Sequence, residues 1–370
     1  NIDLERATIP LRSIDTGRIR NEALRTAFTP LPSTRLQGSL LVTTGLAVNS
    51  GSSTVNLVGD RETIQTVIDF VAPEDFAAAR TRLLDESRQR SAQYTIFLLG
   101  RTDREIDAVV AEIYRSREIA QRHRNELDPE VKEYCTGQME RATRLTSELE
   151  YLLRRALGQG SLIFRGETTA VESLALDVVE ALKKYLAGVA DQVFSRYAEA
   201  PVRIETAIAE KLLRLGNLRS VTAAVDPLNL VQISAGTPSV NNAHKALVSI
   251  RDYLDRNGAT EGKRLTDHFA DAPFGWSPDT LRYLVAAMLL GGQIKLKVAG
   301  RDITVGGQQA IDALRTNNTF KNVGVALRDG ERLPLEVLGR AAERLTELTG
   351  ETVLPFPEDE ISKAALKHFP

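Results

Sequence analysis

The run Gly258-Ala259-Thr260-Glu261-Gly262-Lys263-Arg264 comes closest to a known chemical motif. A phosphate-binding loop, GxxxxGK[ST], surrounds a nucleotide with backbone amides and a lysine, and its Ser or Thr binds magnesium. Here the two glycines are one residue too close together, and Arg264 stands where Ser or Thr is needed. The run also follows a predicted helix, whereas a phosphate loop follows a strand. We therefore interpret it as the end of one helix and the start of another.

Residues for metal or nucleophilic chemistry are few. The chain has one cysteine, Cys135, and its four histidines are widely spaced. They are His123, His244, His268 and His368. Zinc needs closely spaced ligands, and no Gly-x-Ser-x-Gly motif is present. The triplets Glu130-Val131-Lys132 and Glu261-Gly262-Lys263 have no spaced acidic partner that would make a nuclease site. We therefore predict no catalytic residue and no metal ligand; an atypical NTPase or a nuclease with dispersed acids is the alternative.

A predicted helix begins at Ser277, where the side chain can act as N-cap before Pro278 at the first helical position. Apolar residues then recur along one face of this helix. They are Leu281, Leu284, Val285, Met288 and Leu289. The helix must stop at Gly291-Gly292, and Trp276, the only tryptophan, is expected to fill the junction before it.

A short hairpin is predicted directly after this helix. Residues 293–298 pair with 301–305 around Ala299-Gly300, because a two-residue connection with glycine suits a tight turn. A helix followed at once by a hairpin is the second half of a winged helix, and residues 263–270 supply the preceding helix.

The predicted winged helix carries a modest positive charge. Between residues 262 and 305, six basic residues outnumber four acidic residues. The candidate nucleic-acid contacts are Arg282, Lys295, Lys297 and Arg301. Lys295 and Lys297 lie on one face of a strand, so the wing could neutralise phosphates without reading sequence. Winged helices also dock proteins, and the residues alone leave both partners open.

Composition places the whole chain among ordinary soluble proteins. Hydrophobic residues make up 42% and charged residues 26%, so neither disorder nor a membrane-spanning class is indicated. No apolar run approaches the roughly 20 residues of a bilayer helix, and no signal peptide is recognisable, which predicts a cytoplasmic protein without membrane contact. The formal charge of −2 restricts any nucleic-acid binding to a local patch.

The pattern predicts an α+β, mainly helical chain in five parts. They are a small α+β (α/β) unit (1–100), an antiparallel helical hairpin (101–158), a helical bundle with a short strand (159–258), the winged-helix module (259–318) and a strand–turn–helix extension (319–370). The hairpin follows from a heptad-like seam after Asp128-Pro129. That seam indicates a packing arm inside one protein or, alternatively, a dimerising coiled coil. Residues 61–70 and 170–200 are predicted as helices.

Four short pieces resemble, in order, one known family. They are Leu84-Asp85-Glu86-Ser87-Arg88, Glu112-Ile113-Tyr114-Arg115-Ser116-Arg117-Glu118, Phe274-Gly275-Trp276, and Leu348-Thr349-Gly350-Glu351 with Val353-Leu354-Pro355. Together they are similar to the P-loop, AAA-like ATPases of BREX phage defence, the BrxC/PglY type. These are large bacterial proteins that act beside a site-specific methyltransferase.

The resemblance implies a role but no nucleotide site in this chain, because no Walker A motif is present. It implies a C-terminal portion beyond the ATPase core, which relays ATP-driven change to double-stranded DNA or to other BREX components. ATP and magnesium are expected in the parent protein and no cofactor here. The absence of an initial Met and the ending at Pro370 agree with a fragment. Self-association is a further expectation, and a purely structural assembly module remains an alternative.

Overall fold

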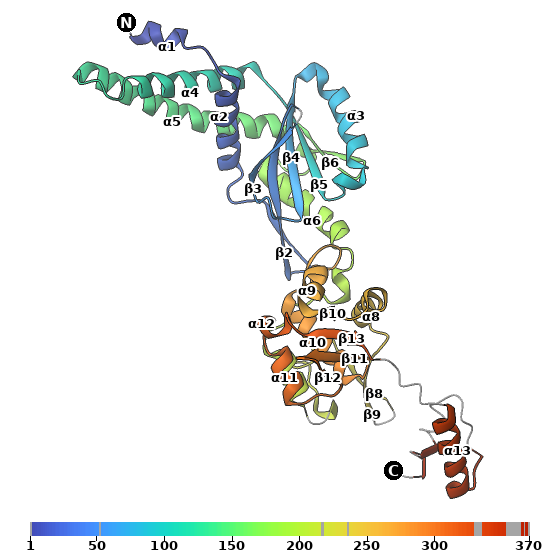
Figure 1. Cartoon of the computed structure of the whole chain (residues 1–370). Coiled ribbons are helices and arrows are strands. Elements are labelled where there is room, and N and C mark those ends of the chain that lie inside the picture. The colour runs from blue at the N-terminus through green and yellow to red at the C-terminus, as the bar shows by residue number, and fades with distance from the viewer. Residues whose placement is uncertain are drawn as a thin grey trace.

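The computed structural model describes residues 2–51, 53–215, 218–234, 237–328, 335–352, 364–365 and 367–368. These residues form an upper body with a large sheet and a projecting helical arm, and a lower body with a small sheet among short helices (Figure 1). The predicted α+β, mainly helical class is confirmed. Each helix in the described ranges is too short or too polar to cross a bilayer.

The large sheet has the order β1-β2-β4-β5-β6-β7, with β3 paired to β2. Its strands are β1 (Ser33–Leu36), β2 (Leu40–Ser50), β3 (Ser53–Val58), β4 (Ile64–Val71), β5 (Thr95–Arg101), β6 (Ser161–Phe164) and β7 (Glu167–Ala170). Strands β2, β4 and β5 are parallel, and the remaining pairs are antiparallel. The sheet therefore crosses residue 100, and the predicted unit 1–100 has to be extended to include β6 and β7.

The two faces of this sheet bury alternate residues of each strand, as strand geometry requires. Helix α3 (Phe76–Ser87) covers the face that contains Val67 and Phe97. Helices α2 (Ser13–Ala27), α5 (Pro129–Gly158) and α6 (Val178–Val193) belong to the core that contains the opposite face.

Two of the predicted helices in this body were wrong. Residues 61–70 contain strand β4, because Ile64, Val67 and Ile68 are β-branched residues that the sheet buries on both sides. Residues 170–200 do not form one helix. Strand β7 ends at Ala170, a short 3-10 turn follows, and α6 begins only after its N-cap Asp177.

The arm consists of α4 (Arg104–Arg122) and α5, which run antiparallel (Figure 1). The predicted seam of α5 faces α4 of the same chain, so these residues support the packing-arm interpretation. Gln138, the polar residue of that seam, is buried and paired with Ser116, with its Oε1 2.9 Å from Ser116 Oγ. Helix α1 (Ile2–Thr8) is fastened to the arm by Arg6, whose Nη1 lies 2.8 Å from Glu112 Oε2.

The lower body contains a four-stranded sheet of order β10-β13-β11-β12 and a separate hairpin, β8-β9. Its strands are β8 (Val231–Ser234), β9 (Thr237–Val240), β10 (Thr260–Glu261), β11 (Ile294–Val298), β12 (Arg301–Ile303) and β13 (Gly324–Leu327). Its helices are α7 (Ile208–Leu213), α8 (Lys245–Asn257), α9 (Gly262–Ala270), α10 (Pro278–Leu290), α11 (Gln308–Leu314) and α12 (Asn317–Phe320). The predicted boundary at 318 separates β13 from the sheet in which it is a central strand, so it also requires correction.

A contact centred on Phe274 joins the two bodies. The Arg196 guanidinium stacks over the Phe274 ring at 4.6 Å from its centroid and donates to Ser249 Oγ at 2.6 Å. Trp276 is buried against Phe269, with ring centroids 5.0 Å apart and planes 3° apart. Trp276 therefore lies in the core at this junction, as the sequence indicated.

One glycine is required in this contact. Gly275 has φ +67°, and a Cβ there would come within 2.7 Å of Leu40 and 2.9 Å of Phe194 side-chain atoms. Its lack of a side chain permits both the left-handed backbone and the close approach of the upper body.

The helix α13 (Leu335–Thr349) agrees with the helix predicted in the extension. The turn predicted at Asp329-Gly330 lies outside the described residues.

Candidate nucleic-acid interface

The predicted wing is a tight antiparallel hairpin. Strands β11 and β12 pair Val298 with Arg301 and Leu296 with Ile303. The two turn residues, Ala299 and Gly300, have φ of +48° and +80°, the combination that a type I′ hairpin turn requires. The turn and its register are therefore as the sequence predicted.

The helix before the wing is capped and terminated as predicted. Ser277 Oγ accepts a hydrogen bond from Thr280 N at 3.1 Å, and Gly291 is the C-cap of α10. Residues 280–289 are all buried, which is more than the one apolar face that the pattern indicated. This burial on every side is possible because α10 is enclosed by α7, α8, α9, α12, β9 and β11.

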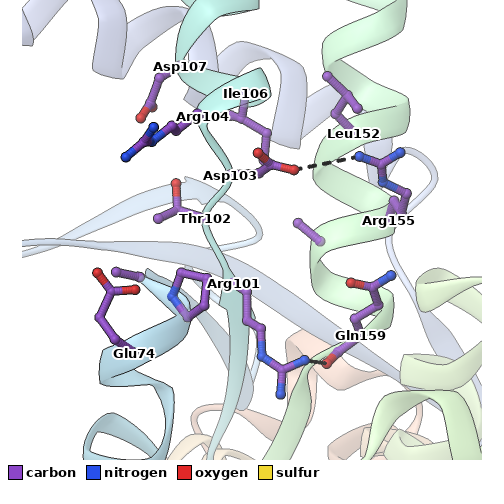
Figure 2. A pocket seen from close by; sticks show the side chains of 13 residues that line it. Glu74, Arg101, Thr102, Asp103, Arg104, Ile106, Asp107, Leu152, Arg155 and Gln159 are labelled. Atoms are coloured by element: carbon purple, nitrogen blue, oxygen red, sulfur yellow. Dashed lines mark hydrogen bonds and ion pairs between the residues drawn. The ribbon is translucent and has the colours of Figure 1, made fainter.

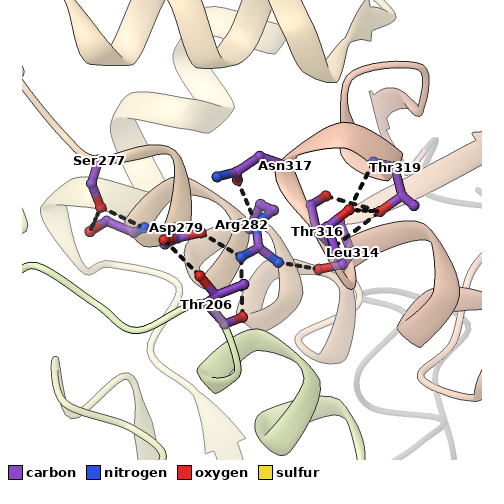
Figure 3. A network of polar contacts seen from close by, with 9 residues as sticks. Thr206, Ser277, Asp279, Arg282, Leu314, Thr316, Asn317 and Thr319 are labelled. Atoms are coloured by element: carbon purple, nitrogen blue, oxygen red, sulfur yellow. Dashed lines mark hydrogen bonds and ion pairs between the residues drawn. The ribbon is translucent and has the colours of Figure 1, made fainter.

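The most distinctive side chain of this helix is Arg282, which is fully buried. Its guanidinium donates to four acceptors, shown in Figure 3. They are Asp279 Oδ1 (2.5 Å), Leu314 O (2.5 Å), Asn317 Oδ1 (2.8 Å) and Thr206 O (3.1 Å). The sequence interpretation of Arg282 as a nucleic-acid contact was wrong, because every outward route from the guanidinium is occupied by the protein itself.

Two segments that are distant in the sequence enclose the Arg282 side chain. The strand β12 is followed by α11 and α12, and these two helices supply Leu314 and Asn317. The segment before α7 supplies Thr206, whose hydroxyl also donates to Asp279 Oδ2 at 3.1 Å. A helix covered in this way cannot enter a DNA groove unless these segments move, so α10 acts as a core element.

The three wing residues have different surroundings. Lys295 is only partly exposed, and its Nζ lies 3.3 Å from Asp302 Oδ2. Lys297 and Arg301 are exposed, and neither forms an ion pair with any residue that the structure describes. The wing therefore offers two available cations, with Lys295 held beside an acid.

Three further basic residues lie at the same end of the small sheet: Lys263 and Arg264 in the first turn of α9, and Lys321 before β13. The sequence interpretation did not select them as contacts. Lys263 and Arg264 were within the module, but Lys321 was assigned to the extension. The position of Lys321 depends on the insertion of β13 between β10 and β11, which no local sequence pattern predicts.

The near-match to a phosphate loop has a different structure. Gly258 ends α8 with φ +70°, and strand β10 follows. The amides of Gly262 and Lys263 donate to Val323 O (2.8 Å) and Lys321 O (3.1 Å). These amides are used in pairing the chain with itself, which agrees with the prediction that the segment is a connection between helices.

A hollow of about 650 Å³ lies in the upper body (Figure 2). It lies at the ends of the adjacent parallel strands β4 and β5, whose following connections run to opposite faces of the sheet. Ligands of open α/β sheets usually bind at such a point. Its arginines are largely engaged: Arg101 stacks over Phe76 at 4.2 Å, and Arg155 lies 2.9 Å from Glu105. Its described lining contains no Ser, Cys, His or Lys, and its hydroxyl group is that of Thr102.

Two titratable groups of the lower body, the exposed His268 and the buried Tyr283, have pKa values shifted by their packing contacts. Burial lowers the pKa of His268, which lies among Tyr253, Phe269 and Phe274. Burial, with a hydrogen bond to Asp226, raises the pKa of Tyr283. No group of His, Cys, Asp and Glu suited to a metal ion occurs among the residues that the structure describes.

These elements define a winged-helix domain: a helix pair, a third helix and a hairpin wing on a small antiparallel sheet. Residues 222–329 match the sequence-family model of the BREX ATP-binding protein BrxC winged helix-turn-helix domain. This match covers less than half of the chain and, for that part, supports the resemblance to the BREX BrxC type. Comparisons with curated proteins and with solved structures found no match.

Proposed function

We propose that this chain is a non-catalytic portion of a bacterial BREX phage-defence protein of the BrxC type. In this proposal, its winged helix contacts double-stranded DNA through the wing and not through α10. The observation that carries the proposal is the complete burial of residues 280–289, beside exposed Lys297 and Arg301. Lysine and arginine contacts to phosphates give affinity without base readout.

The family match supports a wider setting for this proposal. A defence protein of this type would bind ATP and magnesium in an ATPase region elsewhere and would act in the cytoplasm with other BREX components. The helical arm is an additional surface for such partners or for self-association. Docking of a protein on the wing is the second candidate, since a wing that binds no DNA still presents Val305, which is 67% exposed.

The test is duplex binding measured against salt concentration, for the native chain and for the K295E/K297E/R301E variant. We expect native binding that weakens steeply with salt and is lost in the variant, because three cations become three anions next to the phosphates. A variant that binds as well as the native chain would exclude the wing as the contact. No binding at low salt would exclude DNA and favour protein docking.

A nucleotide control accompanies this test. Addition of ATP and magnesium should leave the melting temperature of the chain unchanged, and no hydrolysis should occur, because the sequence contains no GxxxxGK[ST] motif. Clear ATP turnover by this chain would contradict a non-catalytic role.

A further inference from the structure

The small sheet brings the ends of three separate segments together on one side of the lower body. Gly324, at the start of β13, is paired with Lys297 of β11 and with Glu261 of β10. The chain continues from Glu261 into α9, and Lys263 N donates to Lys321 O at 3.1 Å. The start of α9, the residues before β13 and the tip of the wing are consequently neighbours.

These neighbouring segments carry five exposed basic side chains, which we call the basic edge. They are Lys263, Arg264, Lys297, Arg301 and Lys321. None of the five forms an ion pair within the described part of the chain. The acids near this end are Glu261, Asp302 and Asp255, which lines the same hollow as Lys297 and Gly324, and Asp302 already lies beside Lys295. The basic edge therefore keeps a clear excess of positive charge that the protein itself does not neutralise.

The dimensions of the basic edge follow from sheet geometry. Adjacent strands lie about 4.8 Å apart, so the four chain segments from β10 to β12 extend over roughly 14 Å. The major groove of DNA is about 12 Å wide, so cations spaced in this way can reach phosphates on both sides of one groove. Gly324 contributes to this surface, since a Cβ at that position would come within 3.1 Å of Lys297 Cβ.

We infer that the basic edge as a whole, and not the wing alone, binds the phosphate backbone of duplex DNA without sequence preference. The inference rests on the proposed function. It adds Lys263, Arg264 and Lys321 to the contact and assigns them backbone binding, because lysine and arginine contacts to phosphates position a protein on DNA without carrying sequence information. The enclosure of α10 has the same consequence, since the element that reads bases in other winged helices is covered here.

The inference predicts a measurable salt dependence. Each neutralised phosphate contributes about −0.9 to the slope of log K against log salt, so five contacts predict a slope of about −4.5 and the wing pair alone about −1.8. Between 50 and 200 mM salt, native affinity should fall about 500-fold if the whole edge binds, and about 12-fold if only Lys297 and Arg301 do.

The deciding experiment uses the K263Q/R264Q/K321Q variant with the wing unchanged. Its matched control is R80Q/R124Q/K132Q, which removes the same charge from three exposed residues of the upper body that form no ion pair among the described residues. Both are compared with the native chain on two duplexes of unrelated sequence. Circular dichroism spectra and melting temperatures establish that each variant is folded.

We expect the slope of the edge variant to be smaller in magnitude by about 2.7, with the control unchanged and equal affinity for the two duplexes. If the native chain binds duplex and the edge variant keeps the native slope, the inference fails while the proposed function stands. An equal loss in the control would also overturn it, because net charge would then be responsible. If the native chain does not bind duplex, the DNA contact of the proposed function fails as well.

Discussion

Replacement of Arg282 by methionine tests whether the polar network around α10 holds the winged helix together. The guanidinium is fully buried and donates to one carboxylate, two backbone carbonyls and one amide oxygen. Methionine matches the apolar stem of arginine but lacks the guanidinium group, so the variant removes the charge and its donors while keeping the apolar part of the side chain. The acceptors on Thr206, Leu314 and Asn317 would lose this donor.

The expected loss is about 3–5 kcal/mol in the free energy of unfolding, the range found when one partner of a buried ion pair is removed. A sum over four bonds would be larger, but two effects reduce it. The Asp279 side chain is 23% exposed and can be hydrated, and the methionine side chain recovers apolar burial. We therefore expect the lower half of the range.

Urea unfolding followed by tryptophan fluorescence is the appropriate assay. Trp276 is the only tryptophan and lies in the core next to α10, so its signal reports on the lower body even if the two bodies unfold separately. The control is R315M, since Arg315 is 63% exposed and 3.9 Å from Glu210; it should change stability by less than about 0.5 kcal/mol. An R282M variant that loses less than about 1 kcal/mol would refute the role assigned to Arg282.

Two other perturbations have defined outcomes. Asp177 Oδ1 caps α6 by accepting hydrogen bonds from Val179 N (2.9 Å) and Glu180 N (3.1 Å), so D177A should lower the free energy of unfolding by about 1 kcal/mol. The control D191A, on the exposed side of the same helix, should leave it unchanged, and equal effects of the two variants in urea titrations would reject the cap. Burial and nearby Arg256 lower the pKa of His268 below its usual 6.5. The unfolded chain then binds a proton first, so native stability is retained above about pH 6.5 and declines as the pH falls from there. Between pH 7.5 and 5.5, the stability of H268F should fall less than that of the native chain. Identical profiles of stability against pH for the two proteins would contradict the role of His268.

The burial of α10 changes what a winged helix can do in this protein. A winged helix that reads sequence presents its third helix to the major groove. Here α11, α12 and the segment before α7 occupy that side, and Arg282 fixes them to α10 by hydrogen bonds. The proposed DNA contact therefore lies at the basic edge of the small sheet and not on α10.

The sequence determined the parts of this domain whose structure depends on near neighbours. Ser277 with Pro278 starts α10, Gly291 ends it, and Ala299-Gly300 fixes the hairpin register, because caps and tight turns involve residues only a few positions apart. The heptad spacing of α5 likewise predicted the arm, since helical periodicity identifies a buried seam.

Only the tertiary structure decided which surfaces remain free. A buried parallel strand such as β4 and a helix of the same apolar content cannot be distinguished by periodicity alone, because both faces of the strand are covered. The insertion of β13 between β10 and β11 is also non-local, and it alone places Lys321 beside Lys263 and the wing. Arg282 is the clearest example of what the sequence alone could not determine. Its position in the sequence suggested an exposed side chain that contacts DNA, whereas segments 30 and more residues away pack around it and bury it in a polar network.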